Sequence, residues 1–299
     1  MILDAIEWVL IQMYQGLAGA VHVLANASTY FDFSNKENLM RVVYYGASVE
    51  LFFLLFNLAL IVWIVGLFHR PFLWGAVSGM EAFANGVGRI AAWAGLVMVL
   101  QQIMVIFLQS VFRQGEISLA PFGVGIMEPV GWWSDSLKLW NAVVVCLCCA
   151  WTFVQGGHVR VDLFYARVSY RTKRVVDMLG AVVFMIPALV LMWFYAWFFL
   201  WRHLITPKVN ATDPLERTLM KARAVRWNVE TIGFSPNGFD AYILFKILLL
   251  AFCATMLIQA VAVFYRACLE CIEGEQATAK YFDPDDPGDT AAEPSAELQ

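Results

Sequence analysis

Five long apolar runs, almost free of charge, decide what this chain can fold into. They occupy residues 42–68, 90–112, 139–157, 178–201 and 241–265. At 1.5 Å per residue, a helix over each run would cross the roughly 30 Å of hydrocarbon in a bilayer. Charged residues make up only 15% of the sequence, whereas soluble domains carry about 25%. The runs therefore predict an all-α integral membrane protein with five transmembrane helices.

The first 31 residues allow two interpretations. Apolar residues recur at helical spacing from Leu3 to Leu24, opposite a polar stripe that includes Asp4 and Glu7. This pattern is typical of an amphipathic helix that lies in the membrane interface. The stretch Trp8–Phe31, however, carries no formal charge and is long enough to cross the bilayer. The number of spans is therefore five or six.

The chain divides into three predicted parts. Residues 1–88 hold the first span and a short segment at 71–85, which begins with Pro and is predicted to be a second interfacial helix. Residues 89–268 hold the other four spans. The acidic, Pro-rich composition of 269–299 predicts a disordered tail. The loop at 202–240 is long, but its mixed charge predicts no independent domain.

The densest positive charge lies between the third and fourth spans. One acid, Asp162, stands there among five bases. The bases are Arg160, Arg167, Arg171, Lys173 and Arg174. Because short basic loops stay in the cytoplasm, residues 158–174 and the C-terminal tail are predicted to be cytoplasmic. The 202–240 loop is then periplasmic, although it also carries several bases.

Few polar groups fall inside the predicted spans. Glu50 lies about eight residues into the first span, and Asn141 and Gln155 lie in the third. Polar groups at membrane depth mark either a solute pathway or hydrogen bonds to other helices or to a partner subunit. With one carboxylate and no span broken for ion coordination, the sequence favours hydrogen bonds.

The sequence does not contain the residues that several other classes of function require. The four histidines lie at span ends or in the ambiguous first segment, so no facing pair could ligate haem. The six cysteines lie in apolar runs or in one isolated CxxC, which does not supply the four ligands of a zinc site. No catalytic motif and no basic, aromatic-rich nucleic-acid patch occurs. We expect neither an enzyme nor a cofactor, metal or nucleic-acid partner.

The most distinctive stretch is GGHVRVDLF, at residues 156–164. Two glycines can end a helix, and His158, Arg160 and Asp162 then alternate with apolar residues. The polar side chains can face water or lipid phosphate while the others pack inward. Four bases follow, and we expect them to contact lipid headgroups: Arg167, Arg171, Lys173 and Arg174. The residues alone leave open a basic turn without a specific role.

This turn and the following YRTKRVVDMLG resemble the small membrane (Q, DctQ-type) subunit of the tripartite ATP-independent periplasmic (TRAP) transporters. FLQSVFRQ at 107–114 and WWSDSLKLW at 132–140 match the family in order and spacing. The resemblance covers roughly residues 89–268. The chain departs from the family in its N-terminal extension and in Asp135, where the family often has Glu.

The resemblance implies a non-catalytic permease subunit in the bacterial inner membrane. In this family a large (M) subunit carries the sodium and substrate sites, and a soluble periplasmic (P) protein delivers a small organic acid. The implied partners are the M subunit, the P protein transiently, and membrane lipids, with sodium coupling in the partner. Two alternatives are a stand-alone channel or carrier that uses Glu50 and a membrane anchor subunit of a redox complex.

Overall fold

The computed structural model describes residues 2–25, 35–113, 115–119, 126–155, 168–229, 238–275 and 277. Within these residues, five helices are long and apolar enough to cross a membrane. They cover Val49–Phe68, Arg70–Val111, Val130–Val154, Tyr170–Leu204 and Ile243–Glu273. The prediction of an all-α membrane protein with five spanning helices is confirmed.

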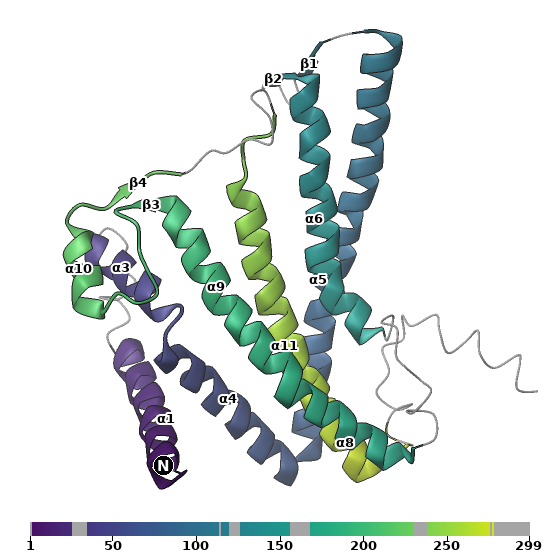
Figure 1. The fold of residues 1–299 in the computed structure, drawn as a ribbon. Coiled ribbons are helices and arrows are strands. Elements are labelled where there is room, and N and C mark those ends of the chain that lie inside the picture. Colours follow the sequence, from purple (N-terminus) through teal and green to yellow (C-terminus); the bar gives the residue numbers. More distant parts are fainter. Residues whose placement is uncertain are drawn as a thin grey trace, which may run out of the picture.

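The five helices are the scaffold of the molecule (Figure 1). They contain α4 (Val49–Phe68), α5 (Arg70–Ile106), α6 (Val130–Val154), α9 (Ile186–Leu204) and α11 (Ile243–Glu273). A buried cluster joins the last four of these helices, near the C-terminal end of α6 and the start of α9. Its residues are Ala84, Ala150, Leu189, Met256 and Ala260. Above this cluster, the α5–α6 pair and the α9–α11 pair diverge in Figure 1.

The first predicted span, 42–68, is two helices in the structure. The short helix α3 (Lys36–Tyr45) ends before Gly46, and α4 begins at Val49. Ser48 caps α4, because its hydroxyl accepts a hydrogen bond from the Leu51 N–H at 3.1 Å. Gly46 lies so close to α9 that a Cβ there would overlap the ring of Trp197. The chain therefore turns at residues that hydropathy alone counts as part of one span.

The predicted break between 85 and 90 is wrong, because α5 runs without interruption through both predicted segments. The short helix predicted at 71–85 is its first half. Pro71 stands at the first turn, where it favours the helix. Gly88 does not end the helix; it allows close contact with α6, since a Cβ there would overlap Trp151. A π-helical turn, Phe107–Val111, follows α5.

The fourth span is also longer than predicted. It begins with α8 (Tyr170–Gly180) and continues through a π-helical turn, Ala181–Met185, into α9. The end of the basic segment before the predicted span is thus the first part of the same long helix. Between α5 and α6, β1 (Glu116–Leu119) and β2 (Ile126–Pro129) form an antiparallel pair that the sequence analysis did not predict.

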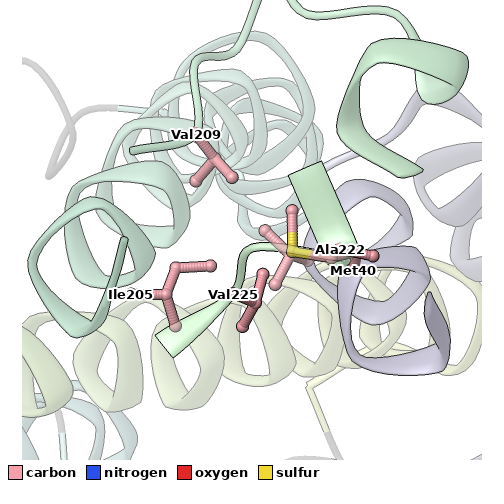
Figure 2. Packing of buried hydrophobic residues seen from close by; sticks show 6 residues of the cluster. Met40, Ile205, Val209, Ala222 and Val225 are labelled. Atoms are coloured by element: carbon pink, nitrogen blue, oxygen red, sulfur yellow. The ribbon is translucent and has the colours of Figure 1, made fainter. Parts of the chain in front are cut away.

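A small packed unit covers the upper end of α9 (Figure 1). This cap consists of α3, β3 (Ile205–Thr206), α10 (Leu215–Ala222) and β4 (Arg226–Trp227). Its buried side chains meet between α3 and the 205–229 segment (Figure 2). They are Met40, Val43, Ile205, Val209, Ala222 and Val225. The loop thus packs against the N-terminal extension, which supplies α3 as its partner.

The N-terminal helix α1 (Ile2–Ala25) packs on α4. The buried Asn57 side chain donates from Nδ2 to the Met13 carbonyl at 2.9 Å. At Gly16 the two backbones are close, since a Cβ would lie 3.1 Å from the Leu54 nitrogen. Helix α1 is not among the five apolar helices found within the described residues. Whether it crosses the membrane stays a prediction with two alternatives.

Candidate functional site

Charged side chains from three helices meet at the lower end of the molecule in Figure 1, where α5, α8 and α11 come together. This ion-pair cluster consists of Glu81, Arg174, Asp177, Arg266 and Glu270. Arg266 donates from Nε to Glu81 Oε1 at 2.6 Å and from Nη2 to Oε2 at 2.5 Å. Its Nη1 lies 3.5 Å from Glu270 Oε1. This bidentate contact between Arg266 and Glu81 joins α5 to α11 with defined geometry.

Arg174 connects α8 to the same cluster. Its Nε lies 2.6 Å from Glu270 Oε2, and its Nη1 lies 3.2 Å from Asp177 Oδ2. The first contact is an ion pair without the geometry of a hydrogen bond, because neither of its two atoms has a hydrogen-bond partner. Glu270 therefore lies between two guanidinium groups, one from its own helix and one from α8.

The two glutamates are almost completely buried. The side chain of Glu270 is 1% exposed and that of Glu81 is 9% exposed. A charge at such a site is tolerated only when it is paired. Removing one member of a buried pair typically costs about 3–5 kcal/mol, because the other charge stays buried. The cluster therefore fixes how the lower ends of α5, α8 and α11 sit against one another.

Aromatic and further charged groups extend this cluster toward solvent. Trp74 donates from Nε1 to Glu273 Oε2 at 3.2 Å, and its ring lies 5.6 Å from the Arg266 guanidinium carbon. Arg70 reaches the other Glu273 oxygen at 3.9 Å and is half exposed. An exposed pair contributes at most about 1 kcal/mol. The strong contacts therefore lie inside and the weak ones at the edge.

The sequence analysis did not single out Glu81, Arg266 or Glu270. Glu81 falls in the segment that was predicted to be interfacial, where a carboxylate needs no partner. Arg266 and Glu270 are four residues apart near the end of an apolar helix. That spacing places them on one helix face and is the signal that could have indicated a buried pair.

At the opposite end, the cap contains one buried acid, Asp213. Asp213 accepts a hydrogen bond from Lys221 Nζ at 2.5 Å, and its other oxygen lies 3.6 Å from Arg217 Nη1. The hydrogen bond from Lys221 lowers the pKa of Asp213 below its usual value. Lys36 of α3 donates to the Val225 carbonyl at 3.1 Å. These contacts fasten α3 and α10 to the loop around an apolar centre.

Helices α5 and α6 share one buried amide. Gln101 donates from Nε2 to the Trp133 carbonyl at 2.7 Å and to Ser136 Oγ at 2.5 Å. Its Oε1 accepts from Trp140 Nε1 at 2.7 Å. The side chain is thus satisfied at both ends. Such hydrogen bonds are a usual means of holding helices together in lipid.

Residues 102–212 match the model of a protein family described as "Tripartite ATP-independent periplasmic transporters, DctQ component". Over this segment, the chain is similar to the DctQ family. It runs from the last turn of α5 through α6 and α9 to the start of the cap. No curated protein and no solved structure matches the chain.

The DctQ segment contains the distinctive turn that the sequence analysis selected. His158, Arg160, Asp162 and Arg167 lie outside the described residues. Of the other predicted headgroup contacts, Arg171 is exposed, Lys173 is half-buried and Arg174 belongs to the ion-pair cluster. Binding of lipid headgroups by these bases stays a prediction.

The predicted intramembrane polar residues do not form one site. Glu50 is half-buried and stands in the first turn of α4, not eight residues inside it, because the helix starts at Val49. Within the DctQ segment, Asn141 is exposed on α6 and Gln155 is half-buried at its C-terminal end. Fourteen residues of helix separate these two amides by about 21 Å.

The described residues show no metal-site geometry. No group of three or more His, Cys, Asp and Glu side chains among them could hold an ion. All six cysteines have free thiols. The charged residues that do meet, in the ion-pair cluster and around Asp213, pair acid with base and hold helices together.

Proposed function

We propose that this chain is the non-catalytic small permease subunit of a TRAP transporter. The match of residues 102–212 to the DctQ component carries the proposal. The internal geometry supports it: Gln101 and the ion-pair cluster are engaged in holding helices to one another. A brace for a larger subunit needs rigid helix packing and no substrate site of its own.

In the proposed complex, the chain braces the large M subunit in the bacterial inner membrane. That subunit carries the sodium and substrate sites, so this chain needs no cofactor or metal. A periplasmic binding protein delivers a small organic acid to the complex, and this protein contacts the chain only transiently. The large apolar side chains that the helices expose, such as Ile90, Phe184 and Leu191, are available to lipid and to the partner.

The proposed orientation places the ion-pair cluster end, residues 158–174 and the C-terminal tail in the cytoplasm. The cap and the rest of the 202–240 loop then face the periplasm. The dense basic segment before α8 supports this orientation. The bases of the cap do not oppose it strongly, because the rule weighs short loops and the cap is a folded unit.

Affinity purification of the tagged chain from its native membranes, followed by mass spectrometry, tests the proposal. Stoichiometric recovery of one large, many-spanning protein is expected. Recovery of the chain alone would overturn the accessory role and favour a channel or carrier that uses Glu50. A visible haem or flavin absorption band would favour a redox anchor.

Replacing Arg160 or Asp162 in the distinctive turn should lower complex assembly or uptake without changing which substrate is taken up. Uptake assays with competing organic acids measure this. A changed substrate preference in either variant would count against the bracing role.

A further inference from the structure

The cap carries a strong excess of positive charge. Together with the last turn of α9, it spans residues 36–45 and 202–229, which hold eight bases and three acids, a formal charge of +5. Six of the bases are exposed, and only two of the acids are. The exposed bases are Lys36, Arg202, Lys208, Arg217, Arg223 and Arg226. Bases are normally disfavoured on the translocated side of a membrane protein, so this excess calls for a reason.

The folding of the cap does not provide that reason. The helix α10 turns Thr218 and Ala222 inward and leaves Glu216, Arg217 and Met220 exposed, and the exposed Arg223 follows its last residue. The buried acid Asp213 is already paired with Lys221 and lies near Arg217. The remaining outward bases contribute little to a core that is built from apolar side chains.

Two large apolar side chains accompany these bases on the surface. Met220 is 70% exposed on α10, and Trp227 is 64% exposed on β4. Trp, Met and Arg are enriched in protein interfaces, and Trp and Arg dominate their binding energy. A face that offers all three beside an excess of positive charge has the composition of a docking surface for an acidic partner.

We propose that the outer face of the cap, formed by Arg217, Met220, Arg223, Arg226 and Trp227, docks a soluble protein with an acidic surface. The inference rests on the proposed function, under which this partner is the periplasmic binding protein. Charge complementarity steers such a partner to the cap and raises its association rate. A second copy of this chain fits poorly, because pairing of two such faces brings like charges together.

The docking face lies outside the segment that matches the DctQ family. That segment ends at residue 212, whereas α3 lies before it and α10 and β4 follow it. The N-terminal extension supplies the helix against which α10 packs. The extension therefore has a consequence for partner binding: without α3, the basic face of α10 has no support.

The test uses phosphatidylcholine vesicles that contain this chain and its large subunit, with the purified binding protein of the same transporter added outside. Uptake is measured against binding-protein concentration. The variant with Arg217→Glu and Arg223→Glu should raise the half-saturating concentration at least about ten-fold, a change of 1.4 kcal/mol. The maximal uptake rate should stay unchanged. Added salt should weaken wild-type docking more than docking of the variant.

Matched controls separate charge from folding. The variant Arg70→Glu reverses an exposed base at the opposite end and should leave the curve unchanged. The double variant with Arg217→Lys and Arg223→Lys keeps the charge and should retain most of the affinity, which a damaged cap would not. Met220→Ala should weaken docking without altering its salt dependence.

The outcomes are distinct. If the wild-type vesicles take up no substrate with any binding protein, the proposed function fails. If they do, and the Glu variants behave like wild type, only the docking inference fails. If the shift appears only in vesicles that contain phosphatidylglycerol, the face binds anionic lipid headgroups and the inference is overturned.

Discussion

The two ends of the bundle are held together by opposite means. At the lower end, the ion-pair cluster joins three helices through buried carboxylates and guanidinium groups. At the upper end, the cap joins α3 to the 205–229 segment through six apolar side chains (Figure 2). Its one buried acid, Asp213, pairs with Lys221 and Arg217 within the same segment and joins no two membrane helices.

The difference predicts how each end responds when a side chain is removed. A buried ion pair is strongly directional, and it penalises the loss of one partner more than the loss of both. An apolar core is less directional, and its stability falls with the volume that is removed. The lower end therefore specifies helix positions, whereas the upper end holds an added unit that can loosen by itself.

The largest effect is expected at the lower end. Arg266→Met leaves Glu81 without its two hydrogen bonds and Glu270 with one guanidinium, so the variant should lose about 3–5 kcal/mol of stability. Thermal unfolding of the purified protein in detergent measures the loss. Arg70→Met is the matched control, because its 3.9 Å contact is exposed and should contribute at most about 1 kcal/mol. Equal effects of the two variants would refute the contrast between buried and edge charges.

The second effect concerns the cap. Met40→Ala removes a fully buried side chain from its centre and should cost about 2–5 kcal/mol. Because the cap is a separate unit, we expect hydrogen exchange to speed up in 205–229 while α11 stays protected. Leu39→Ala, at a partly buried neighbouring position, should have a smaller effect. Uniform loss of protection in both regions would show that the two ends unfold together.

Hydropathy predicted the spans well because apolar length is a property of local sequence. It failed at the ends of the spans, where single contacts decide at which residue a helix begins or ends. Ser48 caps the start of α4, Gly46 lies against Trp197 of α9, and Gly88 inside α5 lies against Trp151 of α6. The two glycine contacts join residues that are far apart in the chain, and a hydropathy average over neighbouring residues does not include them.

The ion-pair cluster and the cap were missed for a related reason. Glu81 and Arg266 are separated by 185 positions, so neither indicates its partner. The cap combines α3 with a loop more than 150 residues later, and each piece alone is too polar to suggest a core. The resemblance to the DctQ family, in contrast, rests on contiguous residues, and the match over 102–212 confirms it.

The third prediction tests whether the hydrogen bonds of Gln101, which join α5 to α6, also contribute to stability. Gln101→Leu removes two donated bonds and leaves Trp140 Nε1 without its acceptor, so it should cost about 1–3 kcal/mol. The adjacent Gln102→Leu changes an exposed amide and should stay within about 0.5 kcal/mol of wild type. Thermal unfolding compares the two variants. A larger loss from Gln102 would mean that the outer face of α5 is engaged.

The smallest effect is a pH dependence confined to the cap. The pKa of Asp213 is lowered in the folded protein, chiefly by the hydrogen bond from Lys221. Its contribution to stability is therefore complete above the pKa of the unfolded chain and is lost as pH falls through the lower folded value. Hydrogen exchange in 205–229, compared between wild type and Asp213→Asn across the acidic range, should show acid loosening only in the wild type. The ion-pair cluster supplies the reference, because Asp213→Asn leaves it intact and should not change exchange in α11. If the Asn variant loosened with acid as the wild type does, a group other than Asp213 would control the acid response of the cap.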